Sequence, residues 1–280
     1  MAMKAFLVRL YSATLLAACV FAPRAFGQSQ QQNVLTPNVR GVIDPETEKK
    51  IGVPTGPVPR LKNGKPDMSG VWNQPYVPDM SKSGRGQQGA SELPFTKAGL
   101  AKWNAYDASQ GDYTGNCLPF GLFRNINSPH PMQIVQNDNY IAFLFEQNTW
   151  FHVVPTDGRP HPKDPDPTWD GNSVGHWDGD TLVIETVGLN DKTRLDTIGH
   201  PHSDKAQVTE RLRRVDAGHI SYEITVDDPV IYSKPWSNTR TFVLRPDWEI
   251  MEYSCEENNK DITEGHIKPF NASNPVPRDK

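Results

Sequence analysis

The feature that most constrains the fold is a long series of short segments in which apolar and polar residues alternate. The series begins at Met132 and continues to Cys255. Alternation with a period of two is typical of β-strands that bury one face. Between segments, Asn137-Asp138-Asn139, Asp178-Gly179-Asp180 and Ala217-Gly218-His219 are typical of tight turns. The expected strands cover residues 132–137, 140–146, 149–155, 173–178, 181–187, 206–216, 219–227, 237–244 and 249–255.

Outside this series we expect one more strand and one helix. Trp72 in Ser-Gly-Val-Trp marks the strand, and Thr96 caps a helix that extends to about Ala108. Proline accounts for 25 of the 280 residues, which disfavours long helices because proline removes a backbone donor. The predicted fold class is therefore all-β: an antiparallel up-and-down β-barrel with an extended N-terminal arm and one short helix.

The N-terminus has the features of a secretory signal peptide. Basic Lys4 and Arg9 precede an apolar run over residues 10–22, which is too short for a membrane span of about 20 residues. Ala25 and Gly27 occupy positions −3 and −1 of a signal-peptidase site, so we expect cleavage after Gly27. The alternative is lipidation at Cys19, which follows Leu-Ala-Ala. The expected organisation is a signal peptide at 1–27, an extended arm at 28–66, a barrel domain at 67–262 and a tail at 263–280.

Cleavage would leave two cysteines, Cys117 and Cys255. An even pair in an oxidising compartment predicts a disulfide, and two buried thiols are the alternative. Cleavage would also change the net charge from −4 to −7, because the first 27 residues hold three basic residues and no acidic one. Such a charge disfavours nucleic acid and anionic lipid as partners.

The order of the expected strands predicts where the connections lie. Alternate connections of an up-and-down sheet lie at the same end, so the short ones around Gln147 and at 178–180, 215–218 and 246–248 should share one end. Long loops at one mouth of a barrel are a usual place for ligand binding. The connections expected at that mouth are 156–172, 188–205 and 228–236, together with the segment after Cys255.

The loop 188–205 carries the candidate catalytic residues His200, His202 and Asp191. We expect His200 and His202 to share proton transfer and Asp191 to orient one of them, because an imidazole backed by a carboxylate is a general acid or base near neutral pH. Alternatively, the two imidazoles bind Zn²⁺ with a third ligand from His161, Asp191 or Glu210, although the intervening proline disfavours this arrangement. A third interpretation is that the imidazoles only cap backbone groups of a folded loop.

Glu210 is the fourth candidate catalytic residue. It shares a strand face with Val208 and Leu212, so we expect its carboxyl group to point into the barrel. A buried carboxylate is costly unless it is paired. Prolines in the loop 156–172 and aromatic residues beside carboxylates suit a flat organic molecule or a sugar. The candidate substrate-binding residues are Arg159, His161, Trp169, His176, Tyr232 and Trp236.

Several long runs resemble a large group of secreted bacterial proteins of uncharacterised activity. The Ser69-Gly-x-Trp start and the meander are similar to lipocalin-like barrels. The resemblance implies secretion and a barrel, but it implies no catalytic residue. The runs are NTWFHVVPTDGRPHPKDPDPTW (148–169), GHWDGDTLVIETVGLNDKT (175–193), GHPHSDKAQVTERLRRVD (199–216), VDDPVIYSKPW (226–236) and YSCEENNKD (253–261).

The leading functional hypothesis is a secreted barrel enzyme that uses cofactor-free acid–base chemistry, of the lyase, hydratase or isomerase type. Its expected partner is a small organic or sugar-like molecule, with no nucleic acid, membrane span, cofactor or metal ion. The sequence contains no G-x-S-x-G, phosphate-loop, G-x-G-x-x-G or H-E-x-x-H motif. Two alternatives are a non-catalytic periplasmic ligand-binding protein and a metal-dependent hydrolase.

Overall fold

A computed structural model of the chain describes residues 43–84, 86–107, 112–257 and 259–265. The predicted signal peptide, Cys19 and most of the predicted tail lie outside the described residues. The helices are α1 (Pro45–Ile51), α2 (Lys97–Asn104), η3 (Tyr113–Asn116), α3 (Gly121–Ile126), η4 (Gln147–Thr149) and α4 (Lys260–Thr263). The strands are β1 (Gly70–Asn73), β2 (Gln87–Gln88), β3 (Met132–Gln136), β4 (Tyr140–Phe145), β5 (Phe151–Pro155), β6 (Asn172–Asp178), β7 (Thr181–Val187), β8 (Gln207–Arg214), β9 (His219–Asp227) and β10 (Trp236–Leu244).

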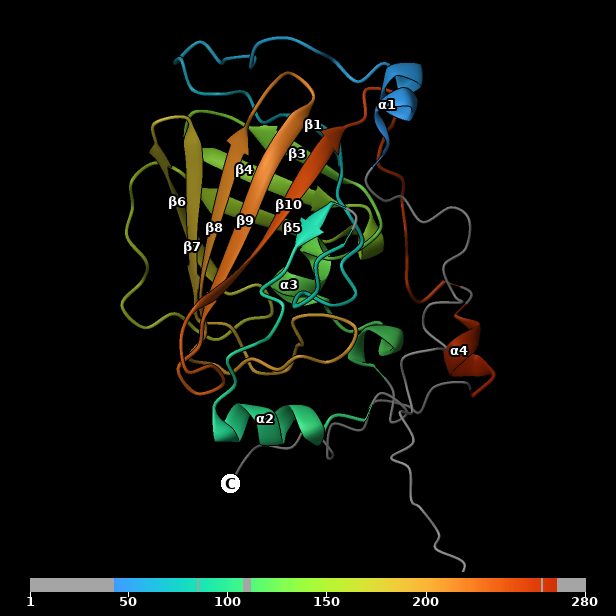
Figure 1. Cartoon of the computed structure of the whole chain (residues 1–280), viewed down its shortest axis with the longest axis vertical. Helices are drawn as coiled ribbons and strands as arrows, with labels where there is room; N and C mark the ends of the chain where they lie inside the picture. Colours follow the sequence, from blue (N-terminus) through green and yellow to red (C-terminus); the bar gives the residue numbers. More distant parts are fainter. Residues whose placement is uncertain (1–42, 85, 108–111, 258, 266–280) are drawn as a thin grey trace, which may run out of the picture. The chain divides into compact units, whose positions relative to one another are not determined.

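Nine of these strands form a nearly closed barrel, which confirms the predicted all-β fold (Figure 1). Their hydrogen-bonded order is β5-β4-β3-β1-β10-β9-β8-β7-β6, and every ladder is antiparallel. The short strand β2 pairs with β10 at Thr239 and Arg240, beyond the point where β1 pairs with Val243 and Leu244.

Side chains close the seam between β5 and β6. His152 Nε2 lies 2.8 Å from Ser173 Oγ, which in turn lies 2.6 Å from Thr186 Oγ1. A Cβ placed on Gly175 would lie 3.2 Å from Val154 Cγ1, so the two strands approach closely there. The barrel is thus continuous in packing although β5 and β6 share no ladder.

The number of strands decides where the loops lie. Eight antiparallel pairings separate β5 from β6, so these two strands run in the same direction. Segment 156–171 therefore runs along the outside of the barrel from one end to the other (Figure 1). The sequence-based prediction placed the short connection at Gln147 at the end opposite the long loops. This prediction is wrong, because it assumed that β5 and β6 are antiparallel. As a result, the connection at Gln147 lies at the same end as loops 188–206 and 228–235; we call this the α2 end.

The barrel interior is filled with side chains. Large residues from several strands, including Trp72, Ile184, Leu212, Tyr222 and Phe242, have no exposed surface. Burial alternates along β9 and β10, as the period-two pattern predicts. Ligand chemistry therefore has to be sought at the surface of the barrel or at its ends.

Several details differ from the sequence-based expectations. Residues 249–255 form no strand, and the edge of β10 that a strand there could have occupied pairs with β1. The predicted helix is α2, with Thr96 Oγ1 accepting from Gly99 N at 2.9 Å, but the prediction of a single short helix is wrong. Short helices such as α3 were missed because they contain too few residues to show a helical period.

The arm before the barrel is partly helical. Asp44 caps α1, and farther along Arg60 pairs with Asp180 of the β6–β7 turn at 2.6 Å. The described part of the arm therefore lies against the barrel end opposite the α2 end.

The predicted disulfide is present. Cys117 follows η3 and Cys255 follows the last strand, with their Cα atoms 5.5 Å apart and 138 residues between them in sequence. Such a bond fits an oxidising compartment. No helix among the described residues combines the length and the apolar character that a membrane crossing requires.

Candidate functional site

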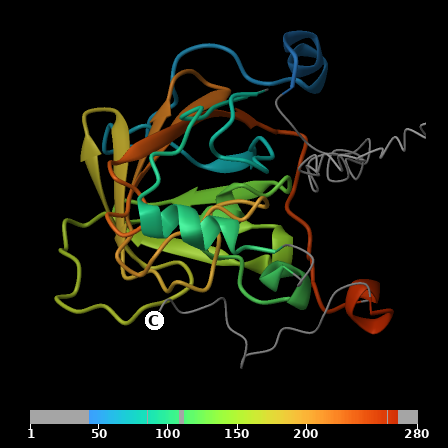
Figure 2. The same cartoon turned by 60° about the horizontal axis from the view of Figure 1, so that its bottom comes forward.

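Two loops and α2 build the α2 end of the barrel, and Figure 2 shows α2 lying across it. Loop 188–206 connects β7 to β8, and loop 228–235 connects β9 to β10. Asp228 ties the loops together, since its carboxylate accepts from Ser203 N at 2.6 Å and from Ser203 Oγ at 2.8 Å. Tyr232 OH adds a bond of 2.9 Å to Pro201 O. These bonds fasten residues 201–203 of loop 188–206 to loop 228–235.

Within this loop, Asp196 and His200 form a buried pair. His200 Nδ1 lies 2.6 Å from Asp196 Oδ2, and both residues are at most 2% exposed. Asp196 also accepts from Met80 N at 2.8 Å and from His200 N at 3.1 Å. Because a carboxylate only accepts, Nδ1 of His200 carries the hydrogen and Nε2 is left for a proton in transfer.

Aromatic side chains surround this imidazole. The Trp103 ring lies 4.9 Å from the His200 ring and the Phe95 ring lies 6.0 Å from it, measured between ring centres. Tyr106 packs against Gly199, whose φ of +91° and lack of a Cβ allow the ring to approach. The three aromatic residues are partly exposed, so they form a rim around the buried imidazole.

Asp79 adds a second carboxylate. Its Oδ1 lies 3.9 Å from His200 Nδ1 and accepts from Ser81 N at 2.9 Å. One ligand atom each from Asp79, Asp196 and His200 lie within 4.8 Å of one another. Two carboxylates and one imidazole are a donor set that suits a divalent transition metal.

His202 lies in a different environment from His200. Its Nε2 contacts Thr193 Oγ1, its Nδ1 lies 3.1 Å from Ser203 O, and its ring packs 5.2 Å from Phe123. Burial lowers the pKa of His202 to about 4. The structure therefore does not bring His200 and His202 together, and both nitrogens of His202 are used within the fold.

The carboxylate that contacts His200 is Asp196 rather than the expected Asp191. Asp191 is partly exposed on the same loop. The four-residue spacing between Asp196 and His200 was visible in the sequence. Asp79, Trp103 and Tyr106 come from distant segments, and no local pattern placed them beside His200.

Glu210 points into the barrel, as predicted, and lies in the interior rather than in the loops. Its Oε1 accepts from Tyr222 OH at 2.8 Å, and burial raises the pKa of Glu210 to about 7. Arg240 places its guanidinium carbon 5.5 Å from the centre of the Tyr222 ring and donates to Asn238 Oδ1 at 2.7 Å. These residues form a second buried polar cluster, distinct from the Asp196–His200 pair.

The predicted substrate-binding residues are distributed over several places. Tyr232 and Trp236 are buried at the α2 end, with their rings 5.4 Å apart. Trp169 stacks on Tyr113 at 6.2 Å, close to α3. The other three lie away from His200: exposed Arg159 pairs with Asp157, His161 contacts Asn172, and His176 is exposed on β6.

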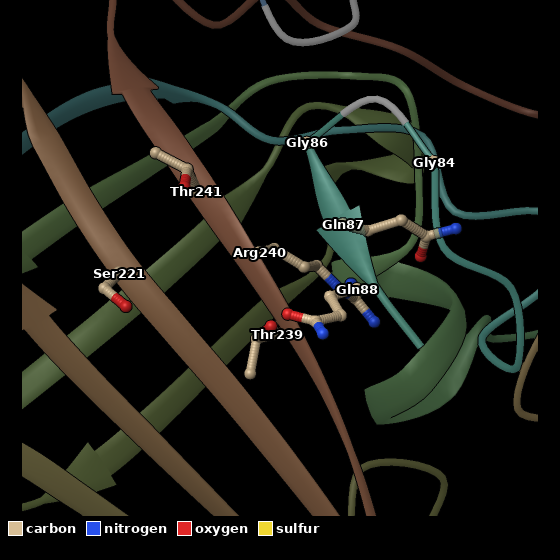
Figure 3. Close-up of a pocket in the computed structure, with 8 residues that line it drawn as sticks. All are labelled: Gly84, Gly86, Gln87, Gln88, Ser221, Thr239, Arg240 and Thr241. Atoms are coloured by element: carbon tan, nitrogen blue, oxygen red, sulfur yellow. The ribbon is translucent and has the colours of Figure 1, made fainter. Parts of the chain in front are cut away.

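A hollow of about 320 Å³ lies outside the barrel, between β2 and the outer side of β9 and β10 (Figure 3). Ser221, Thr239 and Thr241 supply hydroxyl groups, and Gln87 and Gln88 supply amides. Among the described residues that line it, Arg240, which is 3% exposed, is the only titratable one. This part of the lining can accept hydrogen-bonding groups, but it includes no acid–base pair.

The contact between Asp196 and His200 is therefore the candidate site for acid–base chemistry. The chain was compared with protein-family models, with curated proteins and with solved structures. None of the three comparisons finds a match.

Proposed function

We propose that the protein is a secreted small-molecule enzyme in which His200 transfers protons and Asp196 orients it. The observation that carries the proposal is the 2.6 Å contact between His200 Nδ1 and Asp196 Oδ2. Such a contact fixes the tautomer and the direction of the ring and stabilises the imidazolium that forms during proton transfer.

The surroundings support acid–base chemistry on a small organic molecule. The two backbone donors that hold Asp196 keep its carboxylate in place without movement of the loop. The aromatic rim of Phe95, Trp103 and Tyr106 offers flat apolar surfaces beside the imidazole. Lyases, hydratases and isomerases of small molecules need one such positioned proton carrier.

The filled barrel interior favours this proposal over a carrier function, because a lipocalin-type carrier holds its ligand inside the barrel. The disulfide and the features of residues 1–27 support action in the periplasm or outside the cell, after removal of a signal peptide.

Metabolite profiling tests the proposal. Purified wild-type protein and the variants His200→Gln, Asp196→Asn and His176→Ala would each be incubated with a periplasmic small-molecule extract in D₂O, followed by mass spectrometry. We expect the wild type and His176→Ala, which changes an exposed histidine, to convert or deuterate the same compound. His200→Gln should be slower by about 10²–10⁴-fold. If the wild type alters nothing, or if His200→Gln matches it, the proposal is wrong.

Metal-dependent hydrolysis is a second candidate because Asp79, Asp196 and His200 converge. This candidate differs from the ligand set expected from the sequence, since His202 takes no part. It predicts one transition metal per chain in elemental analysis, lost in Asp79→Asn. In the proton-transfer proposal, Asp79→Asn retains activity within a few-fold, because the Asp196–His200 contact does not involve Asp79.

A further inference from the structure

Arg194 is a buried cation that contacts no anionic group among the described residues. Its side chain is 3% exposed; Nη1 donates to Thr193 O at 2.9 Å, and Nε, also buried, has no hydrogen-bond partner. Asp112 and Asp191 act on it electrostatically, but neither lies within 4.0 Å of its nitrogens. A buried guanidinium in this condition is costly, and burial lowers its pKa.

Arg124, a second buried arginine, differs from Arg194 because it pairs with a carboxylate of the fold. Its Nη1 donates to Asp112 Oδ2 at 2.9 Å, and its Nη2 donates to Thr114 Oγ1 at 3.3 Å. Arg124 is thus neutralised within the fold, whereas Arg194 has spare donors. The contrast identifies Arg194 as a cation with a donor left for a bound anion.

Tyr106 connects Arg194 to the Asp196–His200 pair. The Arg194 guanidinium carbon lies 5.5 Å from the centre of the Tyr106 ring, and the same ring packs against Gly199, the neighbour of His200. An anion held by Arg194 would therefore lie across one aromatic ring from the residue proposed to transfer protons.

We propose that Arg194 binds the carboxylate group of a small aromatic substrate. A guanidinium matches the planar, two-oxygen geometry of a carboxylate. The Tyr106 and Trp103 rings suit a flat molecule beside it. The inference rests on the proposed function for the reacting end of the substrate, but carboxylate binding can be measured without turnover.

The test compares benzoate with benzamide, which has the same shape without the charge. Isothermal titration calorimetry at pH 7 would measure both ligands on the wild type, Arg194→Gln, Arg194→Lys and Arg211→Gln. Arg211 is an exposed arginine paired with Asp178, so Arg211→Gln is the matched control. We expect the wild type and Arg211→Gln to bind benzoate at least about tenfold more tightly than benzamide, and Arg194→Gln to lose that preference.

Equal affinity of the wild type for the two ligands, or an unchanged preference in Arg194→Gln, would overturn the inference. If Arg194→Gln does not fold by circular dichroism, Arg194→Lys serves instead: it keeps the charge but loses two-point binding, so the preference should fall without disappearing. His200→Gln separates this inference from the proposed function. If that variant binds benzoate normally and wild-type turnover is absent, only the proposed function fails.

Discussion

Asp196 and Glu210 are two buried carboxyl groups that differ in what donates to them. Asp196 receives two backbone N–H groups and an imidazole, whereas Oε1 of Glu210 receives one tyrosine hydroxyl. A carboxylate surrounded by donors can orient an imidazole as an anion. A carboxyl group in an apolar barrel is driven towards its neutral form, and the pKa of Glu210 is raised to about 7. Burial therefore does not by itself show that a carboxylate can orient an imidazole; the donors around it decide this.

The strongest way to break this comparison is to remove the carboxylate of Asp196. Asp196→Ala leaves the buried N–H groups of Met80 and His200 without their acceptor, at a cost of about 1–3 kcal/mol each. We expect the free energy of unfolding from urea titration at pH 7 to fall by roughly 2–6 kcal/mol. Asp204→Ala, an exposed aspartate nearby, should change it by less than about 0.5 kcal/mol. Equal effects of the two substitutions would contradict the importance assigned to these donors.

Glu210→Gln should raise the free energy of unfolding, whereas Asp196→Ala should lower it. The pKa of Glu210 rises from 4.5 in the unfolded chain to about 7 in the folded protein, so the folded state holds an extra proton between these values. The contribution of Glu210 to the free energy of unfolding is fully present below pH 4.5. It is lost as the pH rises through 7, and the loss amounts to about 3 kcal/mol. Glu210→Gln should therefore gain about 3 kcal/mol relative to the wild type between pH 4.5 and pH 8. A constant difference across that range in urea titrations would show that Glu210 stays ionised.

His202 should make the protein less stable at acidic pH, whereas Glu210 should make it less stable as the pH rises. Its pKa of about 4 in the folded protein lies below the ordinary value of 6.5, so the unfolded chain binds the extra proton. The resulting stability is present above pH 6.5 and is lost as pH falls towards 4, with a slope of up to about 1.4 kcal/mol per pH unit. His202→Gln should reduce the slope of unfolding free energy against pH in this window.

The smallest expected effect is that of Asp79→Asn. The retained Oδ1 can still accept from Ser81 N, and the Asp196–His200 contact remains, so the unfolding free energy should change by less than about 1 kcal/mol. The midpoint of thermal unfolding, measured with and without EDTA, tests in addition whether a metal ion is bound. A midpoint that EDTA lowers in the wild type but not in Asp79→Asn would favour the metal candidate.

Local patterns predicted much of the barrel. The alternation from Met132 onward located the boundaries of β3 to β10 within two residues, and the turn at Asp178-Gly179-Asp180 is the β6–β7 hairpin. The inward direction of Glu210 followed from its neighbours Val208 and Leu212 for the same reason, since a strand repeats every two residues. Residues 249–255 show the limit of such patterns, because an alternating segment becomes a strand only where an edge is free to pair with it.

The candidate site was only partly predictable. His200 was identified from its loop, but its carboxylate partner and its aromatic neighbours were not. Trp103 belongs to α2 and Asp79 to the segment after β1, and both reach His200 through packing between segments far apart in sequence. Sequence spacing cannot express contacts of this kind, because they depend on how the barrel end is covered.

The sequence by itself determined most of the strands and their inward and outward faces, because hydrophobic periodicity is a local property. It predicted the pairing of Cys117 with Cys255, because these two cysteines remain once residues 1–27 are taken as a signal peptide. Only the tertiary structure decided that nine strands close with β5 and β6 parallel, so that segment 156–171 runs the length of the barrel. It also decided that Asp196, rather than Asp191, meets His200. These outcomes depend on strand number and loop packing, which are properties of the whole chain.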